Sequence, residues 1–344
     1  MRNRFRHRTL PIAFAVCFGT VPSLRSQQVT PFASRVIAFD THGNAGGGIF
    51  APGNMLGAPQ GGGLATGSIQ VHSLGIGGEA VLGFDVTITD GPGCDLIVSE
   101  NAFAAGGLDV FAEAVFVEVS SDAVHFARFP SRYAGPSFPA GALGVRPHGS
   151  FAGLAGQSPV YAGSLTMPGA DPRDVVESGG DAFDLSDLAN DPLVLQALVD
   201  LANVHFVRLV DVRSGVDVDT AGVAILDAET GSADIDAVTA IHFVGDVDPQ
   251  GPRCEVRVRA DGTFDVDLAD PDGLSDLDWG RLRMALFGRP LDPSVILGAC
   301  SITLLTSDRV VFSWPYALPV DLRFRLAVSI KDRAGHRSGD ARTR

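Results

Sequence analysis

Apolar and polar residues alternate with a period of two along much of the chain, and this pattern predicts short β-strands. The clearest examples are residues 35–40 (RVIAFD), 79–88 (EAVLGFDVTI) and 204–212 (VHFVRLVDV). Turn-forming sequences, such as GPG at residues 91–93, separate the apolar runs. The 344 residues include 41 Gly and 21 Pro, as is typical of many short strands joined by turns. The pattern therefore predicts an all-β fold.

One hairpin and one helix stand out from this pattern. Residues 111–130 (FAEAVFVEVSSDAVHFARFP) predict two strands joined by a tight turn at residues 121–123. Within residues 185–202, Asp191 is the expected N-cap of a helix and Pro192 its first residue. The apolar residues that recur at helical spacing are Leu195, Leu198, Val199 and Ala202.

The length of the chain favours two hydrophobic cores over one. The polar segment DVDPQGPR at residues 246–253 carries two prolines and is the expected boundary. Six or seven strands follow it in under about 90 residues, a density typical of a small β-sandwich. We therefore expect one domain at residues 30–245 and a second at 254–338.

The N-terminus has the pattern of an export signal at residues 1–26. Arginines in the first eight residues precede an apolar run from Leu10 to Leu24, and small and polar residues follow. The run is short for a membrane span, although an uncleaved signal anchor is the alternative. Cys17 suggests a lipoprotein, but Val16 before it is a poor fit because lipidation signals require a small residue there. The expected location is secreted or in the cell envelope, with no membrane span after cleavage.

Charge narrows the classes of partner. The formal net charge is −14, and the first 26 residues hold five arginines and no acidic residue, so the exported chain is more negative still. Such a surface repels nucleic acid and anionic lipid. Its carboxylates could bind hard cations, although solubility alone also explains them.

Three cysteines follow the signal. Cys254 and Cys300 fall in the same expected domain and form the plausible disulfide, which export permits. Cys94 would then be an unpaired thiol buried in a strand. The cysteines and histidines have no metal-binding spacing.

Catalytic motifs are not evident. The eight histidines lie outside any HExxH context, GxSxG does not occur, and the Gly-rich tract at residues 44–67 precedes no GK[ST]. These observations favour a protein that is not an enzyme. A glycoside hydrolase with a carboxylate pair remains an alternative.

Two resemblances bear on the N-terminal part. FVEVSSDAVHFARF (116–129), followed by HFVRLVDV (205–212), resembles a strand-turn-strand and later strand of galactose-binding-like jelly rolls, which include carbohydrate-binding modules. GCDLIVSENAF (93–103) and FAEAVFVEVSSDA (111–123) are similar to segments of an uncharacterised family of bacterial secreted and cell-surface proteins, some with PEP-CTERM-type sorting tails. The same family is matched, in order, by GLAG (153–156), FDLSDL (183–188) and ADIDAV (233–238).

These resemblances imply a jelly-roll-like β-sandwich in a secreted or cell-surface protein that binds or supports and does not catalyse. The sorting tail is absent, so surface anchoring does not carry over. An extracellular glycan or a surface protein is the implied partner. Few aromatic residues are available to stack on sugars, since both tryptophans, Trp279 and Trp314, lie in the C-terminal part.

The C-terminal part resembles bacterial immunoglobulin-like modules. DPDGLSDLDWGRLRMALFG (270–288) and FRLAVSIKDRAGHRS (324–338) match their recurring pattern, with His336 in place of the usual Asn. The resemblance implies an immunoglobulin-like β-sandwich that serves as a spacer or adhesion unit.

Acidic residues at predicted strand ends form the candidate metal site. The expected ligands, from separate strands, are Glu100, Asn101, Glu113, Asp234 and Asp236. Oxygen ligands converging on one sheet edge would suit Ca²⁺, and an unpaired carboxylate within an apolar strand is costly. Alternatively, these carboxylates accept hydrogen bonds from the backbone or from an arginine such as Arg208.

A second acidic cluster comprises Asp270, Asp272, Asp276 and Asp278. The spacing is similar to an EF-hand loop, but Arg281 stands where that loop needs glutamate and no flanking helix pair is evident. A solvated turn between strands is the favoured interpretation.

Overall fold

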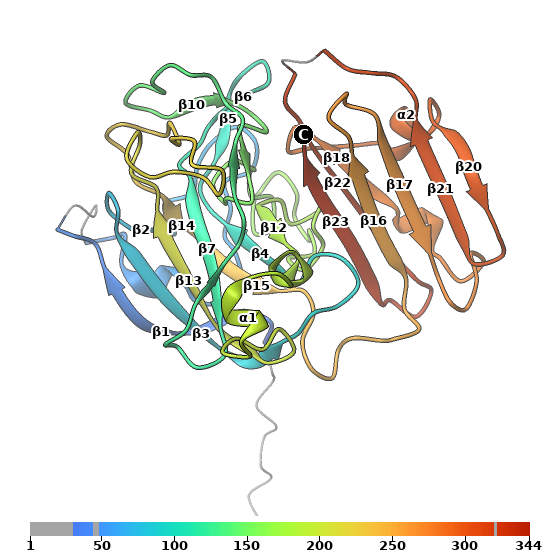
Figure 1. Ribbon diagram of the computed structural model, residues 1–344, viewed down its shortest axis with the longest axis horizontal. Helices are drawn as coiled ribbons and strands as arrows, with labels where there is room; N and C mark the ends of the chain where they lie inside the picture. Colours follow the sequence, from blue (N-terminus) through green and yellow to red (C-terminus); the bar gives the residue numbers. More distant parts are fainter. Residues whose placement is uncertain (1–29, 44–47, 320–321) are drawn as a thin grey trace, which may run out of the picture.

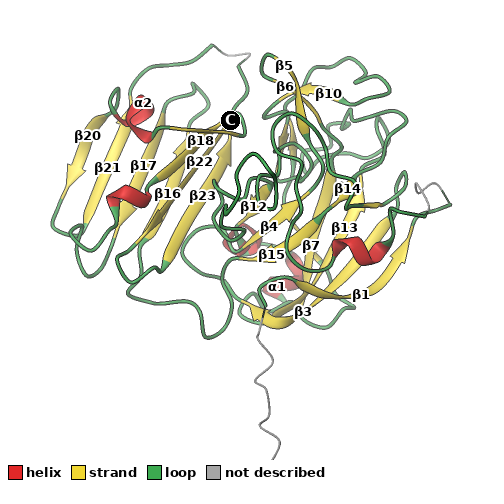
Figure 2. Ribbon diagram, turned by 180° about the vertical axis from the view of Figure 1, so that it is seen from behind, coloured by secondary structure: helices red, strands yellow, loops and turns green. Residues whose placement is uncertain are grey.

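The computed structural model describes residues 30–43, 48–319 and 322–344. In these ranges the chain forms antiparallel sheets and only two short α-helices, α1 (Pro192–Leu195) and α2 (Pro293–Leu297). Single 3₁₀ turns occur at Pro52–Met55, Leu185–Leu188 and Trp279–Arg281. The all-β fold class is confirmed. Figures 1 and 2 show two bodies of sheet side by side.

The N-terminal body is built on a five-stranded sheet in the order β1-β3-β13-β7-β8. Its strands are β1 (Ala33–Asp40), β3 (Glu79–Ile88), β13 (Val204–Asp211), β7 (Val115–Ser120) and β8 (Ala127–Arg128). A three-stranded sheet faces it, formed by β12 (Asp181–Phe183), β4 (Leu96–Ser99) and β15 (Ala237–Ala240). Inward-facing apolar side chains of both sheets, such as Leu82 and Val238, form one buried core.

Three small sheets extend this body. They are β10 (Val145–Pro147), β6 (Asp109–Phe111) and β5 (Phe103–Gly106); β11 (Phe151–Ala152) with β9 (Arg132–Tyr133); and β14 (Asp234–Ile235) with β2 (His72–Ser73). A satellite core that includes Phe116 and Phe151 lies beneath the first two, whereas Ile235 of β14 packs in the main core. These sheets hold the loops that carry the acidic residues.

The C-terminal body is a sandwich of two four-stranded sheets. One contains β16 (Arg253–Val258), β17 (Phe264–Ala269), β21 (Arg309–Trp314) and β20 (Ser301–Leu305), in that order. The other contains β19 (Arg289–Leu291), β18 (Arg283–Leu286), β22 (Arg325–Lys331) and β23 (Arg337–Thr343). Alternate side chains of the two sheets, including Val266 and Val328, meet in a second core.

Strand β23 lies against the N-terminal body (Figure 1). Cys94 N donates to Gly339 O at 2.8 Å, and Gly93 and Gly339 form a parallel bridge. Gly93 has φ +88°, and a Cβ there would lie 2.4 Å from Gly339 O, so only glycine allows this approach. A small apolar cluster that joins Ile97 and Val175 to Ala327 buries the contact.

Most predicted strands are present, and the predicted helix begins where expected but is much shorter. Only α1 forms, capped by Asp191, whose side chain accepts from Leu193 N. Ala197 then takes φ +56°, which interrupts the helix. Of the expected apolar face only Val199 is buried in the core, whereas Leu195 is 71% and Leu198 39% exposed, so the face has little of the tertiary packing that most helical stability requires.

The expected disulfide between Cys254 and Cys300 is not formed; both are free thiols. Cys254 lies in β16, and Cys300 directly precedes β20, at opposite edges of one four-stranded sheet. Three strand spacings separate them by about 14 Å, whereas a disulfide needs Cα atoms within about 7 Å. Cys94 is buried and unpaired, as expected.

We expect reducing agent to leave the melting temperature unchanged, because neither thiol is cross-linked in the fold. Differential alkylation with peptide mapping should find Cys254 and Cys300 reduced. A peptide that links the two residues would contradict the structure.

The expected export signal at residues 1–26 lies outside the described residues. Within the described ranges, no helix has the length and apolar character that a membrane crossing requires.

Candidate functional site

An acidic cluster forms where several strands of the N-terminal body end. Glu100 and Asn101 follow β4, and Asp234 belongs to β14. Glu113 lies between β6 and β7, in a short connection where a continuous strand was expected. Glu100 is 2% exposed, and Glu113 and Asp234 are half-buried.

Electrostatics links these carboxyl groups. Burial raises the pKa of Glu100 well above its usual value, and the charges of Glu113 and Asp234 raise it further. Burial likewise raises the pKa of Glu113, with added repulsion from Asp234, Asp227 and Asp211. The ionised cluster is therefore costly when no cation is present.

Asp211 and Asp227 belong to this cluster, although sequence analysis did not identify them. Burial raises the pKa of Asp211 to about 7 and that of Asp227 to about 8. Asp211 ends the apolar strand β13, and its oxygens accept from Gly77 N and Ala233 N, both at 2.8 Å. The sequence feature that could have identified Asp211 is its position as a carboxylate at the end of an apolar strand.

Hydrogen bonds satisfy only part of the cluster. Glu100 Oε1 accepts from Asp234 N at 3.2 Å, whereas Glu100 Oε2 is buried without a hydrogen-bond partner. Asp227 Oδ2 accepts from Ala114 N at 2.6 Å, and its Oδ1 is also buried and unpartnered. Native buried polar atoms are nearly always paired, so two such oxygens in one acidic cluster require an explanation.

The other polar groups have local partners. Asn101 Oδ1 accepts from Ser68 N, and Asp234 accepts from the hydroxyl of Ser73. Arg208, considered above as a partner for the cluster, instead pairs with Glu118 together with Arg128.

Asp236 points to a different place from the other four predicted ligands. Its oxygens accept from Gln60 N at 3.0 and 2.8 Å. Burial alone raises its pKa to about 7, and no charged neighbour contributes to that shift. The structure thus places Glu100, Asn101, Glu113 and Asp234 near one another and leaves Asp236 apart. The carboxylate oxygens of Glu100, Glu113 and Asp234 do not all lie within 4.8 Å of one another.

Asp236 should make the metal-free protein less stable as pH rises. Its pKa in the fold, about 7, exceeds the ordinary 3.8, so its stabilising contribution is complete below about pH 4 and is lost as pH rises through about 7. Asp236→Asn can still accept from Gln60 N but does not titrate. The measurement is urea unfolding in EDTA between about pH 5 and pH 8. Over this range the free energy of unfolding should fall less in the variant than in the wild type, because each unit by which the fold raises the pKa of Asp236 corresponds to about 1.4 kcal/mol. Equal losses would contradict this interpretation.

Asp90, Asp95 and Asp184, unlike the cluster around Glu100, form a group of carboxylates whose oxygens lie within 4.8 Å of one another. Here the buried Asp95 is satisfied, because it accepts from Gly91 N at 2.8 Å, Leu185 N at 2.7 Å and His242 Nδ1 at 2.9 Å. Arg342 pairs with Asp184 at 3.0 Å. We therefore interpret this group as structural.

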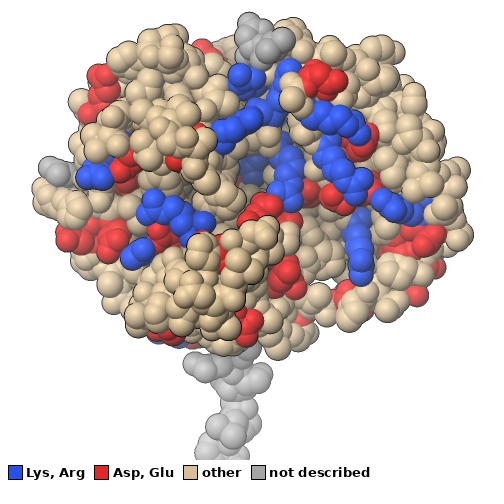
Figure 3. All heavy atoms as spheres, viewed as in Figure 1, with Lys and Arg blue, Asp and Glu red and all other residues tan. Residues whose placement is uncertain are grey.

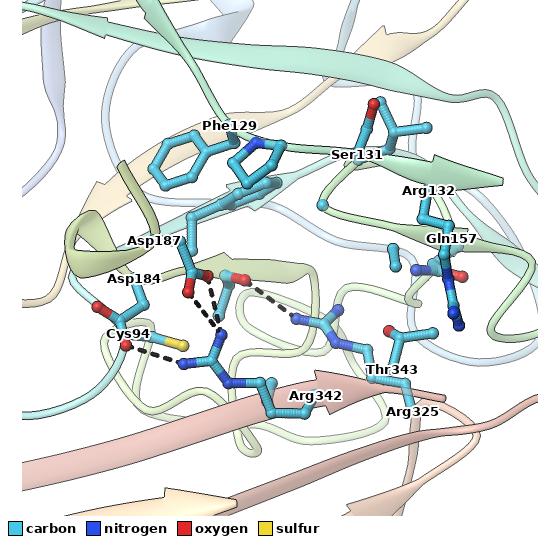
Figure 4. A pocket seen from close by; sticks show the side chains of 17 residues that line it. Cys94, Phe129, Ser131, Arg132, Gln157, Asp184, Asp187, Arg325, Arg342 and Thr343 are labelled. Carbon is cyan, nitrogen blue, oxygen red and sulfur yellow. Dashed lines mark hydrogen bonds and ion pairs between the residues drawn. The ribbon is translucent and has the colours of Figure 1, made fainter. Parts of the chain in front are cut away.

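A pocket of about 320 Å³ opens between the two bodies. Arg342 lies in it between Asp184 and Asp187, with ion pairs of 3.0 and 2.8 Å (Figure 4). Arg132 and Gln157 also line it. Figure 3 shows basic side chains along the hollow between the bodies, interspersed with acidic ones. The pocket thus combines charged hydrogen-bonding groups with a few apolar ones.

In comparisons with known proteins, no family model matches the chain, and no curated protein matches it significantly.

Proposed function

We propose that the protein is an exported, non-catalytic structural or binding protein whose N-terminal sandwich is stabilised by a hard divalent cation, Ca²⁺. The proposed ligands are Glu100, Glu113 and Asp234, with the amide oxygen of Asn101 nearby. One observation carries the proposal: Glu100 Oε2 is buried without a partner in a cluster of like charges.

A cation would remove the energetic cost of this arrangement. A buried carboxylate without a partner costs several kcal/mol or takes up a proton. Ca²⁺ accepts six to eight oxygen ligands in flexible geometries, so carboxylates from separate loops can share it. The bound ion would also fasten the connection that follows β4 to β14 and to the connection that precedes β7.

The export part of the proposal rests on the pattern of residues 1–26 and on the resemblance to bacterial secreted and cell-surface proteins. The jelly-roll-like and immunoglobulin-like assignments rest on resemblance too, and two β-sandwiches are the architecture they require. Such modules serve as supports or binding units.

The test is calcium content. Protein dialysed against Ca²⁺ and then against metal-free buffer should retain bound calcium by mass spectrometry, and Glu100→Gln should lose one ion per chain. Equal calcium in both proteins, or none in the wild type, would refute the proposal.

A carbohydrate ligand is the second candidate, favoured by the pocket between the bodies. Its size suits a small ligand, and its Arg, Gln and Asp side chains are suitable hydrogen-bonding groups for sugar hydroxyls. A glycan array over acidic and neutral polysaccharides, compared with an Arg132→Ala variant, tests this candidate. Absence of binding, or binding unaffected by the substitution, would exclude this pocket as the site.

A further inference from the structure

A third acidic group lies in the C-terminal sandwich. Asp270 follows β17, Asp276 lies in the next turn, and Asp332 follows β22. One carboxylate oxygen from each lies within 4.8 Å of the others. Asp272 and Asp278, the other members of the acidic run, are not in this group. The third member of the group is instead Asp332, which lies more than 50 positions further along the chain.

The backbone holds the two contributing segments together. Arg333 N donates to Asp276 O at 2.9 Å, and Asp278 N donates to Lys331 O at 2.9 Å. Leu277 and Asp332 form an isolated bridge. The three carboxylates are therefore fixed by the sandwich and do not depend on a flexible turn.

Asp270 supplies the observation that points to a ligand. The residue is 1% exposed, and its Oδ1 accepts from Asp272 N at 2.9 Å. Its Oδ2 is buried without a hydrogen-bond partner. Burial raises the pKa of Asp270, and the charges of Asp276 and Asp332 raise it further. This oxygen thus faces like charge and has no donor.

Basic side chains do not resolve this repulsion. His336 Nδ1 lies 2.6 Å from Asp332 Oδ2, so Asp332 has a partner. Neither Asp270 nor Asp276 forms an ion pair within the described ranges. No positively charged side chain in the described ranges therefore balances the charges of Asp270 and Asp276.

We propose that Asp270, Asp276 and Asp332 bind a hard divalent cation such as Ca²⁺, at a site separate from the N-terminal cluster. The ion would join the end of β17 to the end of β22, and hence the two sheets of the C-terminal sandwich. This proposal goes beyond the proposed function and does not depend on it.

Trp279 makes the site testable on its own. Its indole Nε1 donates to Leu274 O at 3.2 Å, so the ring lies against the turn between Asp270 and Asp276. The second tryptophan, Trp314, pairs with Phe264 at the opposite end of β17, roughly 20 Å along the strand. Terbium(III), a luminescent substitute for Ca²⁺, should therefore emit through energy transfer from Trp279.

The experiment titrates terbium into the full chain under selective tryptophan excitation and then adds Ca²⁺. We expect emission that Ca²⁺ displaces, and about tenfold weaker terbium binding in Asp270→Asn because one ligand charge is lost. Asp308→Asn removes an exposed carboxylate from a neighbouring turn and should have no effect. Trp279→Phe should abolish the emission and leave calcium binding by calorimetry unchanged.

Absence of displaceable emission, or equal affinity in wild type and Asp270→Asn, would overturn the proposal. If Asp270→Asn does not fold by circular dichroism, the half-buried Asp276→Asn replaces it with the same expected loss. Glu100→Gln should leave the emission unchanged, which separates this site from the N-terminal one. Loss of emission in Glu100→Gln would also overturn the proposal.

Discussion

Calcium is expected to raise the melting temperature at about pH 8 by roughly 5–10 °C over protein in EDTA. At a free concentration about one hundred times the dissociation constant, a ligand adds about 2.7 kcal/mol to the free energy of unfolding. Each kcal/mol shifts the melting temperature by about 2–4 °C in a body of this size. The ion should stabilise the ionised forms of Glu100 and Glu113 most, because burial and repulsion between like charges disfavour those forms in its absence.

Glu100→Gln separates this effect from non-specific salt stabilisation. The amide removes a buried charge, so in EDTA the variant should be at least as stable as the wild type. In Ca²⁺ the variant should be less stable than the wild type, because one carboxylate oxygen becomes an amide nitrogen and the negative charge that binds the ion is lost. Scanning calorimetry of both proteins checks this crossover. An equal rise in both proteins would assign the stabilisation to another site.

Arg325→Leu is expected to lower the free energy of unfolding by about 3–5 kcal/mol, the usual cost of removing one partner of a buried ion pair. Arg325 is 7% exposed and pairs with Asp181, which is 2% exposed. Asp181 also accepts from Gly156 N at 2.8 Å and Gln157 N at 3.0 Å. The substitution would leave this carboxylate buried without its cation.

Urea unfolding of three further proteins tests the cause. Adding Asp181→Asn to Arg325→Leu should restore part of the loss, since the stranded charge is then removed. Arg257→Ala breaks an ion pair with the exposed Glu255 and a longer one with Asp267, which keeps Arg309 as its partner, so it should cost less than about 1 kcal/mol. Asp181→Asn alone completes the double-mutant cycle. A similar cost for Arg325→Leu and Arg257→Ala would show that the interface pair contributes little.

The alternation of apolar residues was sufficient to predict most strands, because each buries one face against a facing sheet. Strand β3 matches its expected bounds at residues 79–88, and β7 and β8 form the expected hairpin. Strand β23 was missed because RSGDART has almost no apolar residues. Its buried members are small or polar, and Asp340 accepts from Val256 N at 2.8 Å across the sandwich.

The candidate sites show the same limit. Glu100 and Asp234 could be placed at one sheet edge from strand ends, since period-two geometry gives the direction of each side chain. Asp227 could not, because it lies in a loop that has no periodicity. Asp332 joins Asp270 only through tertiary packing, and no spacing rule relates residues so far apart.

The position of β23 has a consequence for biosynthesis. A ribosome makes this strand after every other strand described here, yet its Gly339 binds the backbone of Cys94 in the first body. Until β23 emerges, the apolar cluster of Ile97 and Val175 lacks Ala341 and the close approach of Gly339. Exposed apolar surface on partly made chains attracts chaperones and promotes aggregation. Folding of the contact between the two bodies therefore depends on one late segment, and a premature stop before it would affect both bodies at once.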